Sequence, residues 1–207
     1  RLELKVAGKP ARVALPLLGG LQASNALCAL ALALASGDDA EAATAELEKL
    51  QGVPGRVQLA GRHPAGAPVY VDYAHTPAAL ACVLKALRPH AQGRLHLVFG
   101  CGGDRDSGKR LEMGAIAGKL ADVVIVTDDN PRTEDAADIR AQILAAVPAV
   151  DIGDRAQAIA EAVNGLGPGD ILVVAGKGHE QGQIIGEETR PFDDAEAVGV
   201  ALKEIGQ

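Results

Sequence analysis

The sequence predicts an α/β protein: a Rossmann-like, mostly parallel sheet with helices on both faces, preceded by a short α+β segment. Two observations lead to this class. From residue 53 onward, short runs of Val, Ile and Leu alternate with segments of helical periodicity. These runs also lack the strict apolar–polar alternation of a strand with one face in water, which indicates strands that are buried on both faces.

Residues 1–52 are predicted to contain a hairpin and two helices. The stretch "LELKVAGKPARVALPL" is typical of a hairpin. The stretch "SNALCALALALASG" predicts a helix with Ser24 as its N-cap and Gly37 as its stop, and "DAEAATAELEKL" predicts a second helix that ends at Gly52. Because these elements are too few for an independent core, we expect them to be the tail of a domain, with the next domain occupying residues 53–207.

The second domain is predicted to alternate strands and helices. Strands are expected at "VYVDY", "LHLVFG", "DVVIVT" and "DILVVAG". Helices are expected at "PAALACVLKALRPH", "GKRLEMGAIAGKLA", "DAADIRAQILAAV" and "DRAQAIAEAVNGL". The stretch "QIIGEETRPF" predicts a short hairpin around Gly186 and Glu187, followed by a last helix at "DDAEAVGVALKEI".

The composition excludes several classes of function. A net charge of −7 and a pI near 5.2 argue against a general nucleic-acid or membrane-surface binder. Three widely spaced cysteines without a CxxC pair suggest neither a disulfide framework nor a zinc site. No signal peptide and no apolar run of transmembrane length is apparent, so we expect a cytoplasmic protein without membrane insertion. A monomer is expected as well.

A polar loop follows each predicted strand: "DYAHTP", "GCGGDRDSGKR", "TDDNPR" and "AGKGHE". In doubly wound folds, ligands bind beyond the carboxyl ends of the strands. The third loop, within "TDDNPRTED", places Arg132 among four carboxylates. It can be a capped turn, with Asp135 near an N-cap and Pro131 stiffening the chain, or a pocket for a ligand that carries both charges. Four polar loops at one sheet edge favour the pocket.

The loop "GGDRDSGKR" matches part of a phosphate-binding motif. Gly103, Gly108 and Lys109 fit G-x-x-x-x-G-K, but Arg110 stands where Ser or Thr would hold Mg²⁺. Two aspartates also place negative charge in the turn. We therefore predict a Gly-rich turn with Arg105 directed into the cleft, and no nucleotide site there.

The loops "DYAHTP" and "AGKGHE" each allow two interpretations. Asp72 and His75 can be a solvated strand end and a turn residue, or Asp72 can bind ribose hydroxyls as a carboxylate does in dinucleotide folds. The second loop can be a Gly-rich turn with exposed charges, or a place where backbone approaches a ligand closely beside Lys177, His179 and Glu180.

Taken in order, "PGRVQ", "VDYAHTP", "FGCGGDRDSGKR", "TDDNPRTED" and "AGKGHE" closely resemble the Mur ligase family. The resemblance covers the whole chain. The stretch "LPLLGGLQASNALCALALA" is similar to the end of the family's central ATP-binding domain, and residues from about 53 are similar to its C-terminal domain. It implies a peptidoglycan ligase that uses ATP and Mg²⁺ to add meso-diaminopimelate to UDP-N-acetylmuramoyl-dipeptide through an acyl phosphate.

The resemblance also implies two groups of site residues, none of them catalytic. The group around meso-diaminopimelate is Arg105, Asp129, Asn130, Pro131, Arg132, Gly176 and Glu180. The group near ATP is Asn25, Arg56, Asp72 and His75. In this interpretation, Arg132 binds a carboxylate as a planar fork and Glu180 binds the ammonium group of the same amino-acid head.

One departure from the family is large. Its phosphate-binding loop, its carbamylated lysine and most of its Mg²⁺ ligands have no counterpart in the sequence, so we expect a C-terminal fragment that is inactive alone. The alternative is a stand-alone nucleotide- or dinucleotide-binding Rossmann-like module. Against it, no predicted strand is followed by G-x-G-x-x-G with an acid roughly twenty residues further on.

Overall fold

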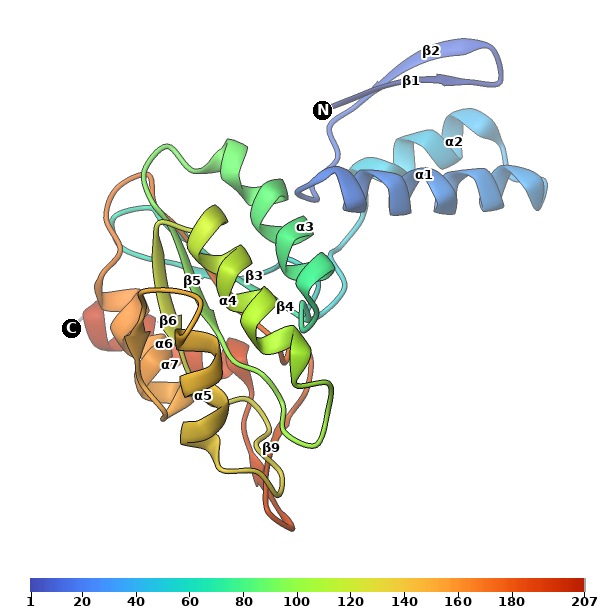
Figure 1. Cartoon of the computed structure of the whole chain (residues 1–207). Helices are drawn as coiled ribbons and strands as arrows, with labels where there is room; N and C mark the ends of the chain where they lie inside the picture. Colours follow the sequence, from blue (N-terminus) through green and yellow to red (C-terminus); the bar gives the residue numbers. More distant parts are fainter. Residues whose placement is uncertain (207) are drawn as a thin grey trace. The chain divides into compact units, whose positions relative to one another are not determined.

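The chain folds into two compact units, Arg1–Val53 and the residues from Pro54 onward. A computed structural model describes residues 1–206 (Figure 1). Each unit has a hydrophobic core of its own, so the expectation that residues 1–52 are too few to form one is wrong. The core of the first unit is small and consists of Val13, Ala26, Leu30 and Leu47.

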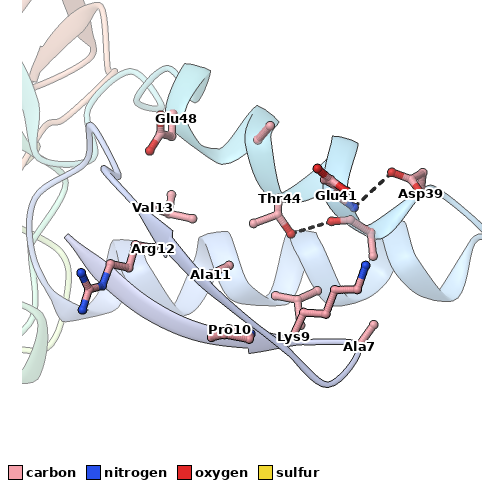
Figure 2. A pocket seen from close by; sticks show the side chains of 13 residues that line it. Ala7, Lys9, Pro10, Ala11, Arg12, Val13, Asp39, Glu41, Thr44 and Glu48 are labelled. Atoms are coloured by element: carbon pink, nitrogen blue, oxygen red, sulfur yellow. Dashed lines mark hydrogen bonds between the residues drawn. The ribbon is translucent and has the colours of Figure 1, made fainter.

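The first unit contains the hairpin and the two helices that the sequence predicts. Strands β1 (Leu2–Val6) and β2 (Lys9–Val13) pair antiparallel. They are followed by α1 (Gly20–Ala35), α2 (Ala40–Glu46) and a 3-10 turn, η1 (Leu47–Lys49). A cavity of about 630 Å³ lies between β2 and α2, where Asp39 accepts hydrogen bonds from the first amides of α2 (Figure 2).

The prediction that Ser24 caps α1 is wrong. The helix begins at Gly20 with Gly19 as its N-cap residue. Ser24 lies in the second turn, where its hydroxyl donates to the Gly20 carbonyl oxygen over 3.1 Å. The predicted stop is confirmed, because α1 ends at Ala35 and Gly37 takes the positive φ of 98° that follows many helices.

The second unit is built on a six-stranded sheet of order β3-β4-β8-β5-β6-β7. Its strands are β3 (Gln58–Arg62), β4 (Pro68–Asp72), β5 (Leu95–Phe99), β6 (Val123–Val126), β7 (Val150–Asp151) and β8 (Ile171–Ala175). Only β3 runs antiparallel to its neighbour, and the other pairs are parallel. The mostly parallel α/β class is confirmed.

Helices cover both faces of this sheet (Figure 1). They are α3 (Pro77–Leu87), α4 (Gly108–Leu120), α5 (Ala136–Leu144), α6 (Arg155–Asn164) and α7 (Asp194–Ile205), with a 3-10 turn, η2 (Arg88–His90), after α3. Helices α3 and α4 pack together, whereas α6 and α7 lie against the other face. A hairpin of β9 (Gly182–Ile185) and β10 (Glu188–Pro191) precedes α7, as predicted.

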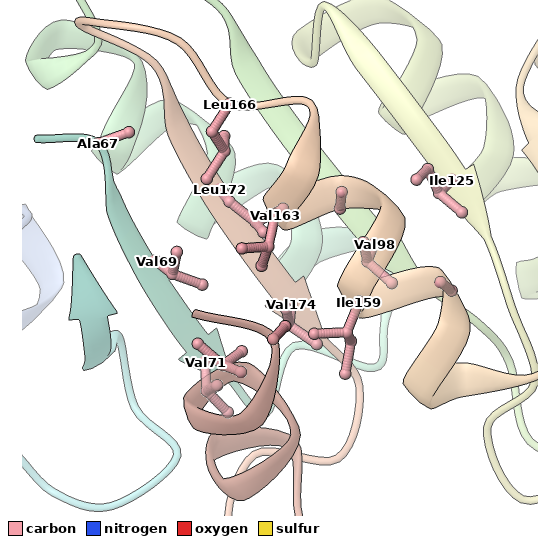
Figure 3. Close-up of a cluster of buried hydrophobic side chains, with 14 residues drawn as sticks. Ala67, Val69, Val71, Val98, Ile125, Ile159, Val163, Leu166, Leu172 and Val174 are labelled. Atoms are coloured by element: carbon pink, nitrogen blue, oxygen red, sulfur yellow. The ribbon is translucent and has the colours of Figure 1, made fainter. Parts of the chain in front are cut away.

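The core between the sheet and helices α6 and α7 consists almost entirely of aliphatic side chains (Figure 3). Val71, Val98 and Val174 come from three neighbouring strands, and Ile159 and Val163 come from α6. These side chains are fully buried, which fixes the strands and therefore the loops that leave their carboxyl ends. Among residues 1–206, no helix combines the length and apolar character that a membrane span requires.

Candidate functional site

A cleft of about 570 Å³ opens beyond the carboxyl ends of β4, β5, β6 and β8. Loops after all four strands contribute to its wall. Six of the seven residues predicted for the amino-acid pocket line it: Arg105, Asp129, Asn130, Arg132, Gly176 and Glu180. His75, which the resemblance places near ATP, lines it as well, whereas Pro131 is buried behind the wall.

The backbone of Arg132 is held by the β9–β10 hairpin. Its amide donates to the Ile184 carbonyl oxygen over 3.1 Å, and its own carbonyl oxygen accepts from the Gly186 amide over 2.7 Å. The residue has a φ of 52°, which is unusual for a residue with a side chain. The hairpin contacts hold this conformation and so fix the starting point of the Arg132 side chain.

The guanidinium group of Arg132 donates hydrogen bonds to main-chain oxygens. Its Nη1 donates to the Gly103 carbonyl oxygen over 2.9 Å and to the Asn130 carbonyl oxygen over 3.3 Å. None of the ion pairs among residues 1–206 includes Arg132. Arg132 therefore lines the cleft as a cation, and no side chain among residues 1–206 forms an ion pair with it.

Asn130 connects its own loop to the loop after β8 and to strand β9 through its side-chain amide. The oxygen Oδ1 accepts from Lys177 Nζ over 2.8 Å and from the Ile184 amide over 3.0 Å. The nitrogen Nδ2 donates to Glu180 Oε2 over 3.0 Å. Asn130 is only 5% exposed, so these contacts satisfy a buried polar group and tie the loops together.

Lys177 is fully buried beneath this cluster. Besides its hydrogen bond to Asn130, its Nζ lies 3.6 Å from Glu180 Oε2. Burial lowers the pKa of Lys177, and the nearby carboxylate of Asp129 opposes this effect. The sequence places Lys177 in the Gly-rich "AGKGHE" loop but does not indicate that its side chain points inward.

The close approach of Asp129 explains the glycine at position 176. A Cβ atom on Gly176 would lie 2.6 Å from Asp129 Oδ2, and the φ of 120° at Gly176 disfavours any side chain. Asp129 is 7% exposed and lines the cleft, and its carbonyl oxygen accepts from Gln183 Nε2 over 2.8 Å. The Asp129 carboxylate therefore occupies the space that a side chain at position 176 would need.

A buried ion pair that sequence reasoning missed lies behind these loops. Arg155, at the start of α6, is held by both carboxylate oxygens of Asp194, at the start of α7. Its Nη2 also donates to the Ala175 carbonyl oxygen over 3.0 Å, at the end of β8. No sequence motif indicates either residue. Each directly follows the aspartate that caps its helix, so in the sequence it looks like an ordinary first residue of a helix.

The loop 102–110 is held by contacts within the protein. The Arg110 side chain is 1% exposed, and its Nη2 donates to Glu134 Oε1 over 2.8 Å. This hydrogen bond lowers the pKa of Glu134. Lys109 Nζ donates to the His75 carbonyl oxygen over 2.9 Å. Arg105, by contrast, is exposed and lines the cleft, where the sequence predicts it.

The four residues predicted near ATP lie in different surroundings. Both Asp72 carboxylate oxygens accept backbone hydrogen bonds, from the Val57 and Ala74 amides at 2.8 Å each, and burial raises the pKa of this group. The guanidinium carbon of Arg56 lies 4.6 Å from the Tyr73 ring centroid. Asn25 belongs to the first unit, where its amide donates to Gln22.

The described contacts thus give Asp72 a role in holding the backbone, and its contact with ribose stays a prediction. His75 is exposed, and its Nδ1 lies 2.8 Å from the Tyr73 carbonyl oxygen. Among residues 1–206, no group of three or more His, Cys, Asp or Glu side chains is arranged to hold a metal ion.

The family of the chain follows from its sequence profile. Residues 55–178 match the profile described as Mur ligase, glutamate ligase domain. The chain belongs to the Mur ligase family. This match confirms the resemblance and does not favour a stand-alone dinucleotide-binding module.

Curated relatives of this Mur ligase chain carry a more specific name. A UDP-N-acetylmuramoyl-L-alanyl-D-glutamate--2,6-diaminopimelate ligase from Mesorhizobium japonicum is 58% identical over 205 residues, which are 99% of this chain. A protein of the same name from Caulobacter vibrioides is 55% identical over 205 residues. The chain spans 42% of the length of each of these two relatives.

Solved structures agree with the Mur ligase fold. A structure titled as the same diaminopimelate ligase is 40% identical, with a TM-score of 0.75, and the match covers 99% of this chain and 43% of that one. A UDP-N-acetylmuramate-alanine ligase from Thermotoga maritima, at 18% identity and a TM-score of 0.69, shares the fold; the match covers 97% of this Mur ligase chain and 41% of that one.

Proposed function

We propose that this chain supplies the amino-acid-binding domain of an ATP-dependent ligase. The ligase adds meso-diaminopimelate to UDP-N-acetylmuramoyl-L-alanyl-D-glutamate in the synthesis of peptidoglycan precursors. The names of relatives at 55–58% identity support this function. In the same proposal, residues 1–52 are the end of a central ATP-binding domain and residues 53–207 are the domain that selects the amino acid.

The observation that carries the proposal is the charge pattern of the cleft. Arg132 lines it as a cation without a direct carboxylate partner among residues 1–206, while Asp129 and Glu180 line it as acids. One amino-acid head carries a carboxylate and an ammonium group on the same carbon. We propose that Arg132 binds the carboxylate, and that Glu180, with Asp129 beside it, binds the ammonium group.

The same pattern supports selection of diaminopimelate over lysine. Both molecules offer an amine at the far end, but only diaminopimelate also offers a carboxylate there. Lysine would leave the half-buried Arg132 guanidinium group without a carboxylate partner, and the loss of a charged hydrogen-bonded pair costs about 2–4 kcal/mol. A site built for a polar group rejects analogues that lack it more strongly than an apolar pocket rejects a missing methylene.

In the proposed reaction, ATP phosphorylates the D-glutamyl carboxylate, and the amine of diaminopimelate attacks the acyl phosphate. The new amide forms as inorganic phosphate leaves, and ADP remains from the first step. We propose that this chain contributes by holding the amino acid so that its other amine faces the acyl phosphate. Asn25, Arg56, Asp72 and His75 are proposed to lie near ATP, and Mg²⁺ would neutralise charge on the phosphates.

Calorimetric titration of the chain with meso-diaminopimelate and with L-lysine tests the proposal. We expect meso-diaminopimelate to bind, L-lysine to bind more weakly, and an Arg132→Ala variant to lose the difference. Arg190→Ala is the matched control, because Arg190 lies on β10, pairs with Glu188 and does not line the cleft. A wild-type chain that binds a nicotinamide dinucleotide and neither amino acid would contradict the proposal.

A further inference from the structure

The amide of Asn130 has a fixed polarity, and Lys177 is one of the two groups that fix it. Lys177 Nζ and the Ile184 amide are both donors, so the atom that they share must be the amide oxygen. The amide nitrogen is therefore directed toward Glu180, to which it donates over 3.0 Å. A flipped amide would place its NH₂ group against two donors.

Lys177 can affect the cleft only indirectly, through the side chains that it contacts. Its side chain is fully buried and does not line the cleft, whereas Asn130 and Glu180 do. Its Nζ lies 2.8 Å from Asn130 Oδ1 and 3.6 Å from Glu180 Oε2, so a single ammonium group contacts both. A buried ammonium group is costly unless it is paired, and these two side chains provide the pairing.

We propose that Lys177 is a positioning residue of the amino-acid site, which orients the Asn130 amide and the Glu180 carboxylate for the ammonium group of the ligand. The inference deepens the proposed function and rests on it for the identity of the ligand. Lys177 does not touch the ligand. It contacts Glu180 Oε2 directly, and it also acts on the same oxygen indirectly, through the Asn130 amide.

Removal of the ammonium group should loosen both contacts. Without Lys177 Nζ, Asn130 Oδ1 keeps only the Ile184 amide as a donor, and Glu180 Oε2 keeps only Asn130 Nδ2. Glu180 would then sample positions that do not face the ligand. A purely structural lysine would behave differently, because its loss would lower stability while leaving the preference between amino acids unchanged.

The test compares Lys177→Met, which keeps an unbranched side chain one atom shorter and removes the ammonium group, with Lys119→Met in the last turn of α4, where the lysine is exposed. We expect Lys177→Met to weaken binding of meso-diaminopimelate about tenfold and to reduce its preference over L-lysine. The NMR signals of the Asn130 side-chain NH₂ and of the Ile184 amide should move in the same variant. Lys119→Met should change neither binding nor these signals.

Several outcomes would overturn the inference. If Lys177→Met binds like the wild type, or leaves both NMR signals in place, Lys177 does not orient the site. If the wild-type chain binds no diaminopimelate, the proposed function fails, while the NMR signals of the ligand-free variant still decide whether Lys177 fixes Asn130. If Lys177→Met does not fold, an NMR measurement on the wild-type chain tests the inference instead. Its Lys177 ammonium protons should show cross-relaxation with the Ile184 amide proton, and the absence of this signal would overturn the inference.

Discussion

Arg155 and Asp194 form an ion pair with no solvent-exposed side-chain surface. Arg155 Nε lies 2.7 Å from Asp194 Oδ1, and Nη2 lies 2.8 Å from Oδ2, so the pair is bidentate. The same guanidinium group donates to main-chain oxygens of Ala175, the last residue of β8, and of Asp128, in the loop after β6. The pair therefore joins the starts of α6 and α7 to two loops of the cleft.

We predict that loss of one partner destabilises the second unit strongly. Arg155→Ala or Asp194→Ala should lower the free energy of unfolding by about 3–5 kcal/mol, because either change leaves a buried charge without its partner. The double variant Arg155→Met/Asp194→Leu removes both charges and should recover much of this loss. Urea unfolding followed by circular dichroism measures all three. Equal losses in the single and double variants would show that pairing is not the cause.

We predict that Arg132→Lys reduces discrimination between the two amino acids. Lys keeps the charge but loses the planar pair of donors, so the preference for meso-diaminopimelate should fall roughly 30- to 1000-fold. The measurement is kcat/KM for each amino acid, in a chimera in which this chain replaces the matching part of the Mesorhizobium japonicum relative. The KM for ATP should stay nearly unchanged. An unaltered preference, or a collapse of ATP binding, would remove Arg132 as the selecting residue.

We predict that Gly176→Ala damages both stability and amino-acid binding. The new methyl group would lie 2.6 Å from Asp129 Oδ2, at a φ of 120°, and the strain should cost about 1–3 kcal/mol or more. Gly66→Ala is the control, because Gly66 has a φ of 89° but no heavy atom within 4 Å of a Cβ built there. Thermal unfolding and calorimetry measure the two effects. Equal behaviour of the two variants would mean that only φ matters.

We predict that Asp170 contributes stability that is lost in acid. Burial raises the pKa of this carboxyl group, but hydrogen bonds from the Gly167 and Arg94 amides and from His96 outweigh burial and lower it from 3.8 to about 2. The stabilisation is therefore present above pH 3.8 and declines as the pH falls toward 2. Asp170→Asn should be less stable at neutral pH and should lose less stability over this acid range. Urea unfolding at several pH values measures both. An acid slope as steep as that of the wild type would refute the prediction.

We predict that the turn from Gly103 to Lys109 does not bind nucleotide. Arg110 is buried against Glu134, and Lys109 Nζ donates to the His75 carbonyl oxygen, so contacts within the protein already engage both cations. Titration with Mg²⁺-ATP should leave the amide signals of residues 103–109 in place. Saturable shifts centred on this turn, at micromolar concentrations of nucleotide, would contradict the prediction.

Most of the second unit could be predicted from its apolar runs, and its two edge strands could not. Strands β4, β5, β6 and β8 are buried on both faces and read as runs of Val, Ile and Leu. Strand β3 is "QLAGR", with exposed and half-buried residues, and β7 is only Val150–Asp151. Edge strands of this kind contain too few apolar residues to be recognised from the sequence. Their position at the two edges of the sheet depends on the pairing of β3 with β4 and of β7 with β6.

The cleft could be located from the loops that follow the strands, because the carboxyl ends of parallel strands meet at one sheet edge. The roles of individual side chains could not be derived in the same way. Lys177 and His179 are two residues apart in one loop, yet Lys177 is fully buried and His179 is exposed. Which of them turns inward depends on Asn130, 47 residues earlier in the chain. Such long-range contacts leave no local pattern.

The strand order has a consequence for the synthesis of the protein. Strand β8 lies between β4 and β5, although it is made after β5, β6 and β7. Until Ile171–Ala175 has left the ribosome, β4 and β5 therefore lack their shared neighbour, and two apolar edges remain exposed to pairing with other chains. The nascent sheet therefore consists of two separate parts, β3–β4 and β5–β6–β7. The loop with Tyr73 follows the first part, and the loop with Arg132 belongs to the second. We expect the cleft to be the last part of this unit to form, and chains that stop before Ile171 to be targets for chaperones and proteases.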